Sequence, residues 1–220
     1  MDSNNSNKSG SLPAWKWTGA EALEWVRDLN ARCLEAIGRR LIRAAAARRD
    51  DGAPIDQEQI DLWRRLDEAA RHRAARCPYL LVEMRFEDAT WWENAKRDSM
   101  KPTPNPTVLP SGTAGLGRAL ANDALNLAWW TARSDQRTAM LLFGLDPRVA
   151  AVIAALSPVE VRRITARSGN QLRPRWENNR GIWRDLLSAA ISADEEALTD
   201  IHLYGIQLLG GDLLSMGKAP

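Results

Sequence analysis

The sequence predicts a mostly α-helical protein, and three observations support this fold class. Apolar residues recur every three or four positions over most of the chain, which is the spacing of one buried helix face. Helix-capping residues and Pro/Gly turns separate these stretches. Hydrophobic residues make up 45% and charged residues 26% of the 220 residues, which is the balance of an ordinary globular protein.

The chain begins with a polar stretch and a long amphipathic helix. Residues 1–12 are rich in Ser, Asn and Gly without periodicity, which is typical of a disordered tail. The first helix is expected from residue 20 to about residue 49. Its apolar face consists of Ala22, Val26, Leu29, Cys33, Ile37 and Leu41.

A second helix completes an expected N-terminal helical hairpin region, residues 13–98. Residues 50–54 (DDGAP) end the first helix, and the second is expected to start at an Asp56 cap and to continue through about Ala70. The apolar run 79–86 fits either a buried strand or a helix start. A short helix should follow it, capped by Asp88.

A proline-rich stretch, residues 99–115, predicts a domain boundary. It contains four prolines and two glycines, which favour an extended connector over a packed element. We therefore expect residues 13–98 and 116–220 to form two separately folded parts.

The second part should open with a long helix, from residue 116 to about residue 143. Its apolar face is too broad for one short bundle to cover, which indicates a partner surface. The candidate oligomer-interface residues are Leu120, Leu127, Trp129 and Trp130.

Two short helices joined by a tight turn should follow this long helix. Gly144 is placed as a C-cap, and Asp146 with Pro147 should start the next helix. Ser157-Pro158-Val159-Glu160 is a capping box that opens a second short helix, to about Arg167. Such a pair is typical of a helix-turn-helix, and also of any compact helical bundle, which the local pattern alone favours.

Several short sequence motifs in this part occur in the same order, and with similar spacing, as in a known protein family. They are Thr138-Ala139-Met140, Phe143-Gly144-Leu145, Ala154-Ala155-Leu156-Ser157-Pro158, Asn170-Gln171-Leu172, Ile201-His202, Gly205-Ile206 and Leu213-Leu214. Over residues 116–214 the chain resembles FlhD, a subunit of the flagellar master transcription activator. The resemblance implies an all-helical domain that self-associates and works with a second subunit, FlhC, to bind promoter DNA and activate transcription.

The family's polar and basic stretch before its last helix corresponds here to Ala193-Asp194-Glu195. Two carboxylates at that position would repel a phosphate backbone. Seven arginines elsewhere are candidate DNA contacts, because guanidinium groups bind phosphates bidentately. They are Arg162, Arg163, Arg167, Arg173, Arg175, Arg180 and Arg184. The alternative is a solvated helical face with carboxylate partners, and the interleaved Trp176 and Trp183 are either base-stacking residues or core anchors.

Other chemistry has little support in the sequence. Cys33 and Cys77 are the only cysteines and show no ligand spacing to His72 or His202, so we expect no metal and no cofactor. His202 is expected to be a packed helix residue. The sequence shows no pairing of a nucleophile with a base that would predict an enzyme. With no export signal and no long apolar run, the prediction is a cytoplasmic protein that does not interact with membranes.

These observations predict a transcriptional regulator of the FlhD type. It would work as a dimer or higher oligomer, with an FlhC-like partner and with promoter DNA bound directly or through that partner. The alternative is an adaptor on the same scaffold that binds proteins and not DNA.

Overall fold

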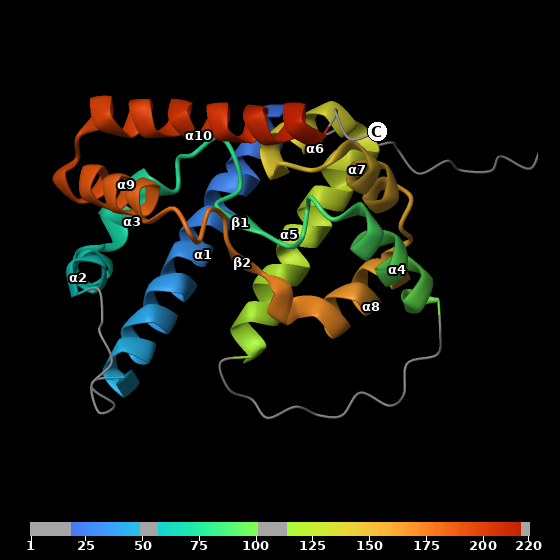
Figure 1. Ribbon diagram of the computed structural model, residues 1–220, viewed down its shortest axis with the longest axis horizontal. Helices are drawn as coiled ribbons and strands as arrows, with labels where there is room; N and C mark the ends of the chain where they lie inside the picture. The colour runs from blue at the N-terminus through green and yellow to red at the C-terminus, as the bar shows by residue number, and fades with distance from the viewer. Residues whose placement is uncertain (1–18, 49–56, 101–113, 217–220) are drawn as a thin grey trace, which may run out of the picture.

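The computed structural model describes residues 19–48, 57–100 and 114–216, which fold into a mostly helical protein (Figure 1). The predicted tail 1–12, the turn 50–54, the Asp56 cap and most of the 99–115 connector lie outside these residues. The helices in the described residues are α1 (Gly19–Arg48), α2 (Gln57–Arg65), α3 (Glu68–Ala74), α4 (Ala89–Ser99), α5 (Ala114–Ser134), α6 (Gln136–Phe143), α7 (Pro147–Ala154), α8 (Pro158–Ser168), α9 (Arg180–Ser192) and α10 (Glu195–Met216). A 3₁₀ turn, η2 (Gly169–Gln171), follows α8, and two short strands, β1 (Val82–Glu83) and β2 (Arg173–Pro174), pair antiparallel.

Most of the predicted helix starts and stops are confirmed. Asp88 caps α4 and accepts a hydrogen bond from the Trp91 N–H. Gly144 ends α6 in the left-handed conformation at φ 60°. Asp146 caps α7, and the Ser157 capping box opens α8 as predicted.

Two predicted helices are each divided by an aspartate. The helix expected over residues 116–143 ends at Ser134, because the Asp135 carboxylate accepts from the Arg137 N–H and starts α6. The second N-terminal helix ends at Arg65, and Asp67 starts α3 by accepting from the Ala70 N–H at 2.7 Å. An aspartate that caps a new helix lets the chain change direction, which a continuous apolar pattern does not reveal.

Two hydrophobic clusters form the core, and both contain residues from before and after the proline-rich stretch. The α5 cluster packs α5 against α1, α4, α6, α7 and α8, and the α9 cluster packs α9 against α2, α3 and α10, with α1 contributing Leu34. In Figure 1, α1 and α5 cross the middle of the molecule side by side, and α10 lies along one edge over α9. The prediction of two separately folded parts is therefore wrong, because neither half holds a complete core of its own.

Residues 77–86 run between the two clusters and are called the central segment below. Its side chains alternate, as those of a strand do. Leu80, Val82, Met84 and Phe86 belong to the α5 cluster, whereas Cys77, Tyr79 and Leu81 belong to the α9 cluster. Of the two structures that the apolar run allowed, a strand is observed, but only at Val82–Glu83, and the chain bends on either side of it.

Two buried polar side chains hold the central segment in place. Asn30 of α1 donates to the Tyr79 carbonyl and accepts from the Leu81 N–H, both at 2.8 Å. Arg175 donates to the carbonyls of Leu80 at 2.9 Å and Phe143 at 2.5 Å, with a longer contact of 3.5 Å to Val82. Buried main-chain groups that lack a ladder partner are satisfied in this way.

Candidate functional site

The seven candidate DNA-binding arginines do not form one surface. Arg175 is only 3% exposed, and its guanidinium bonds three main-chain carbonyls of the protein's own core. A phosphate cannot reach it. The prediction of a DNA contact is therefore wrong for Arg175, which is a core residue.

Three more of these arginines contact other parts of the chain. Arg163 donates to the Ser99 carbonyl at 2.8 Å, and Arg167 donates to the Asp98 carbonyl. Both carbonyls belong to the last turn of α4, where carbonyls lack helical partners and attract cations. Arg173 pairs with the buried Glu83 carboxylate at 2.5 Å, across the β1–β2 pair.

The remaining three arginines are exposed, as Arg167 and Arg173 also are, and they lie on two helices. Arg162 lies on α8, and Arg180 and Arg184 lie on α9, where Arg184 pairs with its neighbour Asp185 at 3.0 Å. Trp183 is 4% exposed and donates to the Arg175 carbonyl, whereas Trp176 is half-buried and packs edge-on against Tyr79. The core-anchor interpretation is confirmed for Trp183.

Three of the four predicted oligomer-interface residues lie in the protein's own core. Leu120, Leu127 and Trp129 are buried, and the Trp129 indole N–H donates to the Leu156 carbonyl at 2.8 Å. The broad face of α5 is covered by α1, α6, α7 and α8, so these three residues are not available to a partner. Trp130 remains 45% exposed, beside the Trp129 ring.

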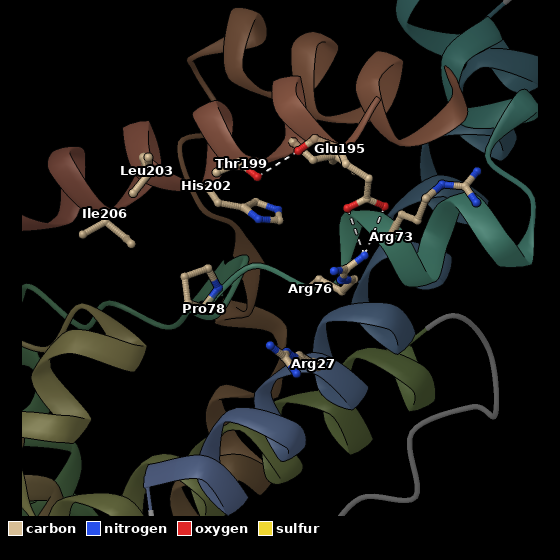
Figure 2. A pocket seen from close by; sticks show the side chains of 10 residues that line it. Arg27, Arg73, Arg76, Pro78, Glu195, Thr199, His202, Leu203 and Ile206 are labelled. Atoms are coloured by element: carbon tan, nitrogen blue, oxygen red, sulfur yellow. Dashed lines mark hydrogen bonds and ion pairs between the residues drawn. The ribbon is translucent and has the colours of Figure 1, made fainter. Parts of the chain in front are cut away.

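The structure contains a cavity that the sequence did not predict, of about 270 Å³, between α1, the C-terminal end of α3 and α10 (Figure 2). Three arginines line it: Arg27 from α1, Arg73 from α3, and Arg76 just after α3. Opposite them, α10 contributes one stripe of side chains. These are Glu195, Leu198, Thr199, His202, Leu203 and Ile206.

The arginines of the cavity are held at defined positions. Arg73 donates through Nε to the Ala190 carbonyl at 2.7 Å. One guanidinium nitrogen of Arg76 contacts both Glu195 carboxylate oxygens, at 3.1 and 3.2 Å. Arg27 pairs with Glu24 one turn before it at 2.6 Å. Figure 2 shows the Arg76–Glu195 pair bridging from the end of α3 to the start of α10.

Two buried nitrogen atoms in the lining lack hydrogen-bond partners. They are Nε of Arg27 and Nε2 of His202. Burial lowers the pKa of His202 below its ordinary value, and the positive charges of Arg76 and Arg27 lower it further, whereas Glu195 acts in the opposite direction. His202 is a helix residue as predicted, and it also faces this cavity.

One side of the cavity is apolar. Pro78 and Leu198 line it, together with Leu203 and Ile206. Leu203 is 52% and Ile206 45% exposed, so these side chains also belong to the outer surface of α10. A cationic wall faces an apolar one, an arrangement suited to an amphipathic anion.

A scan against protein-family models and searches of curated proteins and of solved structures found no match to this chain. Within residues 19–48, 57–100 and 114–216, no helix has the length and apolar content needed to span a bilayer. Among these same residues, no three His, Cys, Asp or Glu side chains lie close enough together to hold a metal ion.

Proposed function

We propose that this chain is a cytoplasmic, non-enzymatic regulator of the FlhD type. It works in an oligomer with an FlhC-like protein, and that partner makes most of the promoter contacts. In this proposal α7 and α8 are the helix-turn-helix-like pair, and α1 with α2 and α3 is the N-terminal hairpin.

The observation that supports the proposal is that four of the seven candidate arginines bind groups of the chain itself. Arg175 is buried, and Arg163, Arg167 and Arg173 bind the chain's own carbonyls and a carboxylate. Arg167 and Arg173 are exposed, as Arg162, Arg180 and Arg184 are, but some of their N–H groups already have acceptors within the chain, which leaves fewer donors for phosphates. These arginine contacts fit a complex in which a partner supplies most of the DNA contacts better than they fit DNA binding by this chain alone.

Three of the motifs that resemble FlhD contain positions with tight steric or capping requirements in this structure. A Cβ on Gly144 would lie 2.5 Å from an Arg175 nitrogen, and a Cβ on Gly205 would lie 1.8 Å from the Tyr79 hydroxyl. The Leu156-Ser157-Pro158 motif coincides with the α8 capping box.

Trp130 is the residue we expect to contact a protein partner, because exposed tryptophans are enriched in interfaces. Co-expression with an FlhC-like protein should give a complex that co-elutes on gel filtration. Trp130→Ser should weaken it at least about tenfold, while Trp25→Ser, which removes a comparably exposed tryptophan from α1, should not. Equal loss with both variants would remove Trp130 from the interface.

A second experiment tests which subunit contacts the DNA. It measures affinity for a promoter-length duplex across a salt series, with and without the partner. If Arg162, Arg180 and Arg184 supply all contacts of this chain, its contribution to the slope of log affinity against log salt is at most about −3. Arg162→Ala with Arg180→Ala should reduce the slope by about two units, and Arg40→Ala with Arg43→Ala, on the distant end of α1, should not.

Each outcome of this measurement separates the candidate functions. Binding that requires the partner supports the proposal, and insensitivity to the arginine variants then assigns the DNA contact wholly to the partner. A complex that never binds DNA favours the adaptor function. Tight, steeply salt-dependent binding by this chain alone, or no complex at all, contradicts the proposal.

A further inference from the structure

We propose that the cavity between α1, α3 and α10 binds a small organic acid, that is, a carboxylate carried on a short apolar group. This site goes beyond the regulator function and does not depend on it. Four features of the cavity support such a ligand: its charge, its unpartnered nitrogens, its apolar wall and its size.

The charges that line the cavity are unbalanced toward positive. Arg27, Arg73 and Arg76 line it, against two carboxylates: Glu195 in the lining and Glu24, which lies outside the lining and pairs with Arg27. Guanidinium groups stay protonated at all physiological pH values and match the geometry of a carboxylate with paired N–H donors. An incoming carboxylate would share Arg76 with Glu195, or displace it, at the point where the two helices are bridged.

The two unpartnered nitrogens point to a missing acceptor. Nε of Arg27 is a donor, and Nε2 of His202 carries a hydrogen in one of its neutral tautomers. A buried donor without an acceptor destabilises a fold, so such atoms call for an explanation. Both nitrogens are covered in this structure, so a rotation of either side chain would be needed to bring them to the oxygens of a carboxylate in the cavity.

The apolar wall and the volume distinguish an organic acid from an inorganic anion. Pro78, Leu198, Leu203 and Ile206 offer no hydrogen bonds to a hydrated phosphate or sulfate. The cavity of about 270 Å³ lies just below the range of drug-sized pockets. A short fatty acid fits both properties, since its head meets the arginines and its tail covers the leucine and isoleucine side chains.

The imidazole of His202 can report binding at this site, because it lines the cavity. His202 and His72 are its only histidines, and His72 is exposed on α3. A carboxylate bound beside His202 adds negative charge and should raise its pKa from the lowered value set by burial and by Arg76 and Arg27. His72 should not respond.

The test is an NMR titration of the two imidazoles in the full chain, with sodium hexanoate as the probe, sodium chloride at matched ionic strength, and inorganic phosphate as a third arm. We expect saturable shifts and a raised pKa at His202 with hexanoate alone, and an unmoved His72. A silent His202, or equal movement of both histidines, would overturn the proposal. Phosphate binding as tight as that of hexanoate would overturn the assignment to an organic acid.

Variants place the ligand in the cavity. Arg76→Gln removes an exposed side chain and should weaken hexanoate binding at least about tenfold, since hydrogen bonds to charged groups are the strong ones. Arg64→Gln is the matched control, because it breaks an exposed arginine–carboxylate pair on α2 and lies outside the cavity lining. Unchanged binding by Arg76→Gln, or equal loss in Arg64→Gln, would contradict the site.

Discussion

Arg175 is a charged side chain in the core of the protein. Its guanidinium is the donor for carbonyls of the central segment and of α6. These partners are distant along the chain, since Leu80 is separated from Arg175 by 95 residues.

We predict that Arg175→Gln lowers the free energy of unfolding by about 3 kcal/mol or more, because it leaves buried carbonyls without donors. Arg175→Lys should not restore stability, since a single ammonium cannot reproduce the guanidinium fork. Urea denaturation followed by circular dichroism measures both. The control, Arg162→Gln on the exposed side of α8, should change stability by less than about 0.5 kcal/mol. Equal effects at the two positions would contradict the core role of Arg175.

The lowered pKa of His202 predicts a loss of stability at acidic pH. Above its ordinary value of 6.5 the imidazole is neutral in both the folded and unfolded chain. As the pH falls below that value, the unfolded chain binds the proton first, because burial and the facing Arg27 and Arg76 disfavour the charged form in the fold. Stability is therefore lost as the pH falls toward the lowered pKa.

The measurement is the unfolding midpoint at about pH 7.5 and at about pH 5, on either side of the ordinary histidine value. His202→Gln should reduce the difference in midpoint between the two pH values. His72→Gln, which changes the exposed histidine on α3, should leave that difference as in the parent chain. A His202→Gln protein with the full acid loss would assign the loss to other groups.

Among the helices, the ends were easier to predict than the breaks. Gly144, Asp146 and Ser157 carry local capping signals, and each is where the sequence placed it. Asp67 and Asp135 were missed because an aspartate inside an apolar periodic stretch fits an exposed helix position as well as a cap. Tertiary packing, not local propensity, makes them caps.

Two residues that end helices in the left-handed conformation give a matched pair of predictions. Gly144→Ala adds a Cβ at φ 60°, 2.5 Å from an Arg175 nitrogen and 2.7 Å from a Leu209 methyl carbon, and should destabilise by more than about 1 kcal/mol. Ala193, at φ 56° after α9, already has a Cβ, so Ala193→Gly should relieve strain and stabilise by up to about 1 kcal/mol. Thermal unfolding measures both, and the same sign for both variants would contradict the argument.

For the whole molecule, the proline-rich stretch lies between two helices but does not separate two hydrophobic cores. α4 ends at Ser99 and α5 begins at Ala114, close to the predicted limits of 99 and 115. The inference of two domains failed because α1 packs on α5 as well as on α2 and α3, and α4 packs on α7 and α8. A sequence pattern does not show which helices pack together.

We predict that the two sides stay together when the chain is cut. A specific protease site placed within residues 101–113 should give two fragments that co-elute and keep the helical circular dichroism of the intact chain, because both clusters join them. An isolated fragment of residues 114–220 should expose apolar surface and bind a hydrophobic dye. Folding of that fragment alone, with the stability of the intact chain, would restore the two-domain architecture.

The cavity was beyond sequence analysis for a similar reason. Its α10 stripe, Glu195, Thr199, His202 and Leu203, has helical spacing and could have been identified as one face. Nothing local indicates that Arg27 lies opposite that face. The seven candidate DNA-binding arginines are close together along the chain. The three arginines of the cavity are far apart in sequence or on different elements, and only the fold brings them together.

The central segment also affects how the protein is made. A ribosome that has just synthesised Leu80 must add 95 more residues before Arg175 exists to bind its carbonyl. At typical elongation rates this takes roughly 5 to 20 s. During that interval the apolar residues of the segment have no completed core to enter, so the nascent chain exposes them to chaperones or to other nascent chains. Expression yield of this protein should therefore depend on chaperone supply more than its folded stability alone would indicate.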